Sequence, residues 1–210
     1  IKLDRLVCLR YILTMKMIKR ESKVREKILE TASDLFYTQG YHVTGINEII
    51  EKSCVAKATF YSHFPSKEDL CLSYIHTMNL RDIELIMNEL KRRKSPYKRF
   101  MASIEVLKPL MLSTQFKGCR FLNIVPEIKD PKNPIRKEGI LHFEAFRPIL
   151  RDLSQELIDS DSKKFNHLNS KKLADDYLTI QMGAIALCEI YHDIWPVDQA
   201  IDFVKRLIKK

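Results

Sequence analysis

The sequence predicts an all-α protein, and three observations support that fold class. The 210 residues include only five Gly and eight Pro, which is few for a turn-rich sheet protein. Apolar residues recur at three- and four-residue spacing through most of the chain. We find no convincing strand pattern and no internal repeat. The 45% hydrophobic content is ample for the packed cores of one or two domains.

The first predicted helix covers Glu21–Gln39. Its apolar residues recur on one face at helical spacing, and they are Val24, Ile28, Ala32, Leu35 and Phe36. Gly40 follows directly, and we expect it to cap the helix in the left-handed conformation.

Two short helices are expected next, at about Gly45–Lys52 and Lys57–His63, joined by a turn at Ser53–Ala56. The Thr44 hydroxyl can cap the first of them, and Pro65 ends the second. The apolar residues expected to face the core are Ile46, Ile49, Ile50, Phe60 and Phe64. Two helices this short, so close together, are typical of a helix-turn-helix, which lays its second helix in the DNA major groove.

A long helix is expected from Ser66 to about Arg93. Ser66 can cap it, and Asp69 three residues later completes a start that is similar to a capping box. The apolar positions that carry the pattern are Leu70, Tyr74, Met78 and Leu85. Such a helix of roughly 27 residues would be about 40 Å long.

The rest of the chain keeps a helical pattern, interrupted by prolines. The expected helices are Tyr97–Ser113, Gly118–Glu127, Lys137–Asp159, Ser170–Ile194 and Val197–Ile208. Pro131 and Pro134 indicate a loop, and Pro148 predicts a bend inside its helix. Disorder is expected at the amino terminus and around Asp159–Leu168.

Charge and cysteine content narrow the functional classes. The net charge is +9, and residues 1–67 hold 12 Lys and Arg against 7 Asp and Glu, so a nucleic-acid partner is compatible with the composition. The five cysteines are scattered without a Cys-x-x-Cys pair, which favours neither a zinc site nor a disulfide framework. A reducing, cytoplasmic setting and no membrane association are expected.

The first residues are unusual, because Ile1–Thr14 is apolar and basic without a helix cap. One hypothesis is that translation starts at Met15 or Met17 and that residues 1–16 are disordered or a non-native extension. An ordinary amino-terminal helix is the alternative.

The helix-turn-helix region resembles the amino-terminal domain of the TetR family of bacterial transcriptional regulators. The resemblance rests on Gly40–Leu70 and above all on the run Val55-Ala56-Lys57-Ala58-Thr59-Phe60-Tyr61-Ser62-His63-Phe64-Pro65-Ser66-Lys67-Glu68-Asp69-Leu70. Three positions depart from the family pattern. Cys54 stands where a turn glycine is usual, Ala56 where a capping serine is usual, and Ala58 where a glycine is usual. Cys54 is therefore expected to take a left-handed backbone, and α-helical capping at Ala56 to be weaker by about 1 kcal/mol.

Seven residues are predicted to touch DNA: Thr44, Lys57, Ala58, Thr59, Tyr61, His63 and Lys67. Lys57 and Thr59 can bond base edges, and Ala58 allows close approach. The resemblance implies that Tyr61 and His63 reach phosphates. Thr44 and Lys67 stand at helix amino termini, where backbone N–H groups favour a phosphate. The alternatives are that Thr44 is only a cap, that Lys67 is a solvated charge and that Tyr61 packs on the long helix.

The carboxy-terminal part resembles one branch of the family more loosely, at Gly118–Asn123, Asp130-Pro131, Leu173-Ala174 and Gly183-Ala184. The resemblance implies a division into a DNA-binding domain at 17–66 and a ligand-binding and dimerisation domain at 67–210. It also implies a homodimer whose last two long helices pair; the candidate seam residues are Leu141, Phe143, Ala145, Leu178, Met182, Ala186 and Ile190. A small-molecule effector is expected in an apolar cavity. Its candidate lining residues, which could equally be ordinary core, are Phe100, Met111, Phe116, Phe121, Phe146 and Tyr177.

Other chemistry is not expected. No nucleophile elbow, phosphate loop or dinucleotide glycine pattern is present, so we predict no enzyme activity, no catalytic residues and no cofactor. His76, His142 and His192-Asp193 do not have metal-ligand spacing. The basic run Lys91–Lys94 is interpreted as a solvated face, and Cys119 as a small apolar residue rather than a redox sensor.

The sequence therefore predicts a dimeric transcriptional repressor that binds a palindromic double-stranded operator and that a small-molecule ligand releases. Two alternatives stay open: a helical small-molecule-binding dimer that has lost DNA binding, and a dimeric interaction protein. A steep loss of DNA affinity with added salt would favour the regulator, because phosphate contacts release counterions.

Overall fold

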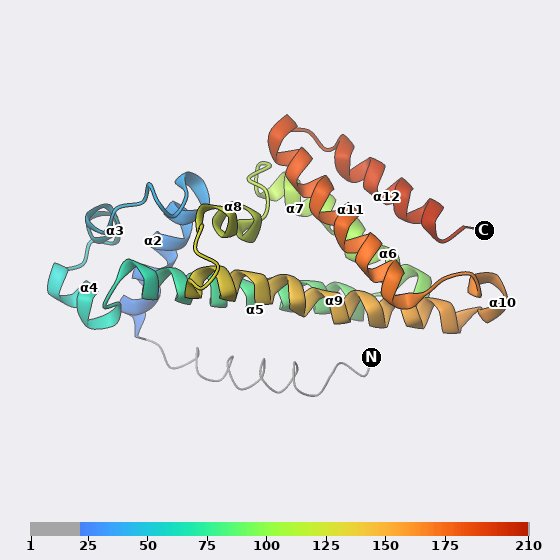
Figure 1. Cartoon of the computed structure of the whole chain (residues 1–210). Helices are drawn as coiled ribbons and strands as arrows, with labels where there is room; N and C mark the ends of the chain where they lie inside the picture. The colour runs from blue at the N-terminus through green and yellow to red at the C-terminus, as the bar shows by residue number, and fades with distance from the viewer. Residues whose placement is uncertain (1–21, 210) are drawn as a thin grey trace. The chain divides into compact units, whose positions relative to one another are not determined.

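The computed structural model describes residues 22–209, and over that range every regular element is a helix (Figure 1). The predicted all-α class is confirmed, and the expectations for residues 1–16 lie outside the described residues. The helices are α2 (Lys23–Gln39), α3 (Ile46–Ser53), α4 (Lys57–His63), α5 (Lys67–Lys91), α6 (Pro96–Glu105), α7 (Leu107–Ser113), α8 (Arg120–Glu127), α9 (Pro134–Ser160), α10 (Ser162–Phe165), α11 (Ser170–Tyr191) and α12 (Trp195–Leu207).

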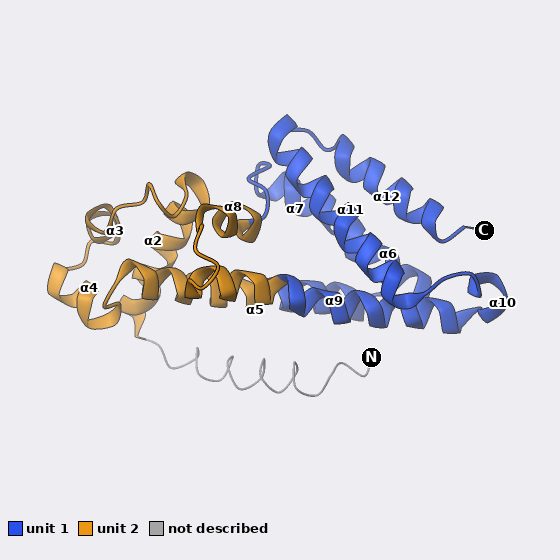
Figure 2. Cartoon of the chain, in the orientation of Figure 1, with its two compact units in different colours: residues 1–4, 82–119, 143–210 blue, residues 5–81, 120–142 orange. Residues whose placement is uncertain are grey.

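The described chain divides into two compact units, which Figure 2 colours separately. The first, here called the helix-turn-helix unit, combines residues 22–81 with residues 120–142; the carboxy-terminal unit combines residues 82–119 with residues 143–209. Each boundary falls inside or next to a helix rather than in a linker, since α5 and α9 both contribute to the two units. These compact units do not coincide with the expected functional domains 17–66 and 67–210, which stay a prediction, because α8 and the start of α9 pack with α2 and α5.

The core of the helix-turn-helix unit is built on α2 and α5. The predicted inner residues Ile28, Ala32, Leu35 and Phe36 of α2 are all buried, whereas Val24 is 37% exposed and does not belong to this face. The ring of Phe36 lies 5.7 Å from that of Tyr74 on α5, a tilted aromatic contact. Of the isoleucines in α3, Ile49 is fully buried, while Ile46 and Ile50 lie half-buried at its edge.

Local caps explain most helix ends. Asp69 donates its backbone N–H to Ser66 Oγ at 3.0 Å, and Ser66 donates its hydroxyl to the Asp69 carboxylate, so the expected start of α5 is confirmed. Gly40 donates its N–H to Phe36 O after α2, but its φ of 90° and ψ of 165° lie outside the left-handed helical region that we predicted. The positive φ still requires glycine.

Proline accounts for the largest difference in the carboxy-terminal unit. The single helix expected over Tyr97–Ser113 is two helices, α6 and α7, which meet at Val106. Pro109 has no N–H to donate to Glu105 O, and its ring crowds that carbonyl, so a continuous helix is disfavoured there.

Two more expectations at α9 and α10 were wrong. Pro134 does not stay in a loop but begins α9, which the Asn133 side chain caps by accepting the Ile135 N–H at 2.8 Å. The segment expected to be disordered around Asp159–Leu168 contains α10, where Asp161 caps the turn and Phe165 is buried.

His142 of α9 is buried within the helix-turn-helix unit, against α5 and α8. Its ring stacks on Phe121 with centroids 3.6 Å apart, and its Nδ1 lies 3.0 Å from Asn79 Oδ1. Burial, helped by the nearby charge of Arg120, lowers the pKa of His142 to about 3. The imidazole is therefore neutral in the folded protein, and this packing position explains the residue without a metal.

Acid should destabilise the fold through His142. The unfolded chain binds a proton at this ring below about pH 6.5, whereas the folded chain does not until about pH 3, so the stability contributed by the neutral ring is lost as the pH falls through that window. The free energy of unfolding of His142→Asn, measured by urea denaturation between pH 7 and pH 5, should therefore depend less on pH than that of the wild type. His167→Asn, at an exposed site, is the control; equal pH dependence in His142→Asn and wild type would contradict the assignment.

Candidate functional site

Helices α3 and α4, with the turn between them, form the helix-turn-helix predicted from the sequence. α4 begins and ends at the expected residues, Lys57 and His63. Cys54 ends α3 in the left-handed conformation, with φ 51° and ψ 44°, and donates its N–H to Ile50 O and Glu51 O. The expected left-handed cysteine is confirmed, and the turn keeps its sharp angle without glycine.

The start of α4 lacks a side-chain cap. Ala56 occupies the capping position with extended backbone, φ −66° and ψ 145°, and makes no side-chain bond to the helix. A serine or threonine hydroxyl at such a position accepts a backbone N–H of the first turn. The expected loss of the cap is therefore confirmed.

The two sides of α4 differ in burial. Phe60 is 0% and the following Phe64 1% exposed, so they anchor the helix in the core of the unit. Lys57, Ala58 and Tyr61 lie on the exposed side, and Tyr61 contacts the edge of the Phe60 ring at a centroid distance of 5.3 Å.

The other predicted contacts of α4 are half-buried, and one residue was missed. Thr59 and His63 lie at the border between the core and the exposed side. Ser62 was missed by sequence reasoning although it is exposed. Its position four residues after Ala58 places it on the same helical face, and that spacing could have revealed it.

Thr44 is placed differently from the prediction. Its side chain is 0% exposed, and its hydroxyl donates to Gly40 O at 2.6 Å instead of capping α3. Gly45 is the capping residue of α3, without a side-chain bond. The cap prediction was wrong because the hydroxyl closes the preceding turn; a backbone contact of this segment with phosphate stays a prediction.

Lys67 begins α5, but its ammonium group points back to the loop between α2 and α3. Nζ donates to Tyr41 O and to Thr44 O, each at 3.0 Å, and lies 4.5 Å from the centroid of the Tyr41 ring. The side chain therefore has a structural role, and a phosphate contact of Lys67 stays a prediction for its backbone.

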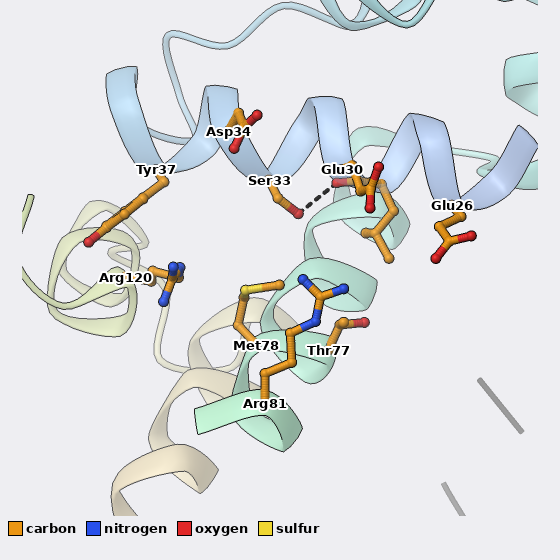
Figure 3. Close-up of a pocket in the computed structure, with 10 residues that line it drawn as sticks. Glu26, Glu30, Ser33, Asp34, Tyr37, Thr77, Met78, Arg81 and Arg120 are labelled. Atoms are coloured by element: carbon orange, nitrogen blue, oxygen red, sulfur yellow. Dashed lines mark hydrogen bonds between the residues drawn. The ribbon is translucent and has the colours of Figure 1, made fainter. Parts of the chain in front are cut away.

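A second face of the unit carries charges of both signs. A cavity of about 310 Å³ lies between α2, α5 and Arg120 of α8 (Figure 3). Its α2 wall carries Glu26, Glu30 and Asp34, and Arg81 points toward it from α5. The lining combines these carboxylates with the cations Arg81 and Arg120, whereas the exposed side of α4 carries Lys57, so α3 and α4 are the candidate nucleic-acid interface.

The six candidate ligand residues do not form one group. Phe100, Met111 and Tyr177 are buried in the carboxy-terminal unit, where Phe100 and Tyr177 meet edge to face at 5.0 Å. Phe146 is 9% exposed and Phe116 is half-buried, and both belong to the same unit. Phe121 belongs instead to the helix-turn-helix unit, stacked on His142.

A buried polar cluster accompanies Tyr177. Tyr177 donates its hydroxyl to Phe100 O at 2.9 Å, and Ser103 lies within hydrogen-bond distance of the same hydroxyl. Burial raises the pKa of Tyr177, so the phenol stays protonated. Gln181, which sequence reasoning missed, donates Nε2 to Ser103 O at 3.1 Å, while its buried Oε1 has no hydrogen-bond partner among residues 22–209. The sequence signal for Gln181 was a single glutamine among apolar residues of a helix, because a buried amide needs hydrogen-bond partners.

Residues 22–209 form neither a metal site nor a reactive thiol site. Over that range no three His, Cys, Asp or Glu side chains are placed to hold a metal ion. The four described cysteines are free thiols, and burial raises the pKa of Cys71 and of Cys188. Among the described helices, none is long and apolar enough to span a bilayer.

Comparison with known proteins agrees with this geometry. Residues 28–74, from α2 into α5, match the model of the bacterial regulatory proteins of the tetR family. An uncharacterized HTH-type transcriptional regulator of Lactococcus lactis subsp. lactis is 24% identical over 194 residues, which cover 89% of this chain and 93% of that relative. The uncharacterized HTH-type regulator YxaF of Bacillus subtilis is 50% identical over 52 residues, but these cover only 24% of this chain and 27% of the relative.

Solved structures share the whole fold. SCO4454, a TetR-family transcriptional regulator from Streptomyces coelicolor, aligns with a TM-score of 0.81 at 23% identity over 90% of this chain and 95% of that chain. A regulatory protein TetR from Rhodobacter sphaeroides aligns with a TM-score of 0.77 at 20% identity over 88% of this chain and 98% of that chain. At these identities the likeness establishes the fold alone.

A side-chain cap restored at the start of α4 should stabilise the protein. Ala56→Ser supplies a hydroxyl at a residue whose backbone already has capping geometry, so the free energy of unfolding should rise by about 0.5–2 kcal/mol in urea denaturation. Ala58→Ser, inside the first turn, is the matched control and should not stabilise. A gain that is equal in both variants would show that the hydroxyl does not act as a cap.

Proposed function

We propose that this chain, a member of the TetR family of bacterial transcriptional regulators, is a dimeric repressor that leaves a palindromic operator when a small molecule binds. The observation that carries the proposal is the two-sided burial of α4. Phe60 and Phe64 fix the helix, and the opposite side presents Lys57, Ala58 and Tyr61 to solvent. A rigid helix with a long cation, a small residue and a phenol on its free face fits the major groove and the flanking phosphates. We expect the protein to act in the cytoplasm, on the bacterial chromosome.

Dimerisation is supported by an apolar surface on α11 and α12. The two helices pack against each other within the carboxy-terminal unit, yet several of their large apolar side chains remain exposed. These are Leu187, Ile190, Tyr191, Trp195 and Phe203. Ile190 is 70% exposed and Phe203 is 52% exposed, which is unfavourable for a monomer in water. We therefore place the twofold seam on α11 and α12, rather than on the expected pair over Lys137–Asp159 and Ser170–Ile194.

The twofold axis would place two recognition helices on one face of the DNA. Half-sites separated by about one helical turn, 34–36 Å, match such a dimer. An effector that binds more tightly to dimers with one spacing of the recognition helices shifts the population toward that spacing. The coupling free energy between effector binding and DNA binding is typically about 1–3 kcal/mol.

The effector site is proposed in the carboxy-terminal unit. The cluster of Phe100, Tyr177, Ser103 and Gln181 combines aromatic packing with a buried acceptor, Gln181 Oε1. An apolar ligand with one hydrogen-bond donor would satisfy that acceptor, as in most small-molecule sites.

Lys57→Ala should weaken operator binding by about 1–3 kcal/mol, roughly 5- to 150-fold, because it removes a candidate base contact. The operator is first selected from the gene's own upstream DNA, and affinity is measured by fluorescence anisotropy against unrelated duplex. Lys94→Ala, which removes an exposed charge in the carboxy-terminal unit, is the matched control and should have no effect. Equal losses in the two variants would mean that net charge, not α4, determines binding. A wild-type protein without DNA preference would favour the carrier that has lost DNA binding.

Ile190→Glu should shift the protein from dimer to monomer, because it buries an unpaired carboxylate in the proposed seam. Sedimentation velocity measures the shift at several concentrations. Leu112→Glu makes the same change at a residue of α7 that is 54% exposed, and it should leave the dimer intact. A dimer that persists in Ile190→Glu would exclude this surface as the seam.

A further inference from the structure

The loop between α2 and α3 is held by a carboxylate from a distant part of the sequence. Glu127, the last residue of α8, accepts the backbone N–H of Tyr41 at 3.0 Å and that of His42 at 2.9 Å. The ring Nε2 of His42 lies 3.1 Å from Glu127 O. All three residues belong to the helix-turn-helix unit, so the contact is internal to that unit (Figure 2). Hydrogen bonds to an ionised acceptor are the stronger kind in proteins.

Gly40 shows how closely the carboxylate approaches the loop. A Cβ built on Gly40 would lie 2.9 Å from Glu127 Oε1, closer than side chains tolerate. The same residue has a φ of 90°. Glycine is therefore required at this position both by the backbone and by the space that Glu127 occupies.

A cation holds the opposite edge of the same loop. The Lys67 ammonium donates to Tyr41 O and to Thr44 O. Within the loop of residues 40–44, the Glu127 carboxylate therefore satisfies two N–H groups and the Lys67 ammonium satisfies two C=O groups. Between Glu127 and Lys67, the loop has little freedom. Gly45 and the first turn of α3 follow directly, so the loop conformation determines where α3 begins.

Helix α8 is itself fixed at both ends. At its start, the Arg120 guanidinium lies 4.5 Å from the centroid of the Tyr37 ring on α2, and Figure 3 shows the two side chains side by side. Near its end, Arg136 of α9 donates to Val125 O at 2.9 Å and to Ile128 O at 3.0 Å, so the last carbonyls are satisfied. Glu127 therefore keeps its place at the loop for as long as these contacts hold α8 against α2 and α9.

The chain enters α8 from the other unit. Residues up to 119 belong to the carboxy-terminal unit, and Arg120 is the first residue of the helix-turn-helix unit on this return. Residues 119 and 120 are joined by one peptide bond, so a conformational change at the end of residues 82–119 acts directly on the start of α8. Among the described residues, Glu127 is the side chain of α8 that bonds the backbone leading into α3.

We propose that Glu127 is a positioning residue for DNA binding: it presets the loop of residues 40–44, and through it α3 and α4, so that displacement of α8 lowers operator affinity. This inference rests on the proposed function and names the contact through which regulation would act. The physical basis is pre-organisation, because a loop ordered before binding does not lose that freedom in the complex. Losing the contact should lower affinity by the range typical of coupled sites, about 5- to 150-fold.

The test compares Glu127→Gln and Glu127→Ala with wild type and with the control Glu84→Gln, which changes an exposed glutamate of α5. The amide of Glu127→Gln keeps the size of the side chain but turns a donor group toward the loop N–H groups. Hydrogen exchange of the free protein measures protection of the Tyr41 and His42 amides. Fluorescence anisotropy measures affinity for the operator and for unrelated duplex, and urea denaturation measures folding.

The expected result is faster exchange at both amides and weaker operator binding in the two Glu127 variants, which still unfold cooperatively in urea, while the Glu84→Gln control behaves as the wild type. Unchanged exchange would overturn the proposal, because the carboxylate would not hold the loop. Faster exchange with equal or higher operator affinity would overturn it as well, because the loop would not position the DNA-binding helices. If the wild-type protein has no preferred DNA, the proposed function fails, and the exchange measurement still decides whether Glu127 holds the loop.

Discussion

The burial of two aromatic rings is the constraint on which the candidate interface depends. α3 and α4 contain eight and seven residues, well below the ~12–15 at which an isolated helix becomes marginally stable in water. α4 also lacks a side-chain cap. It is helical because Phe60 and Phe64 occupy the core formed by α2 and α5. The same burial determines which residues face outward, so the orientation of the exposed side of α4 follows from packing rather than from helix propensity.

Charge is distributed over this scaffold in two roles. The exposed side of α4 carries a cation, while the outer face of α2 carries three carboxylates around the cavity in Figure 3. Glu127 and Lys67 have a different role, since each bonds backbone groups of the same loop. Backbone groups at the ends of short helices need partners, and ionised side chains satisfy two at a time. Charged residues near a nucleic-acid surface are therefore not all nucleic-acid contacts.

Local chemistry could be read from the sequence, and long-range contacts could not. The limits of α4, the left-handed Cys54 and the Ser66–Asp69 cap depend on neighbours within a few residues, and all three were predicted. The Thr44 hydroxyl could either donate to the Gly40 carbonyl or accept a backbone N–H of α3, and the sequence does not say which bond it makes. The direction of the Lys67 side chain and the contact of Glu127 with Tyr41 depend on partners 26 and 86 residues away. The packing of α8 on α2 is likewise a contact between distant parts of the sequence, so neither this packing nor the compact units could be predicted.

Three of the five glycines lie where a Cβ would overlap another side chain. The space of a Cβ at Gly40 is occupied by Glu127, at Gly118 by Glu189 and at Gly139 by Val125. These glycines therefore do not mark hinges; each records the position of a partner far along the sequence. Gly40 and Gly118 also have a positive φ, so these positions keep glycine whatever side chain faces them. Gly139 has no such backbone constraint, so it and Val125 are free to change together, because a side chain at position 139 displaces Val125 and a smaller residue at position 125 leaves a void. Covariation between positions 125 and 139 would thus record this packing in related chains.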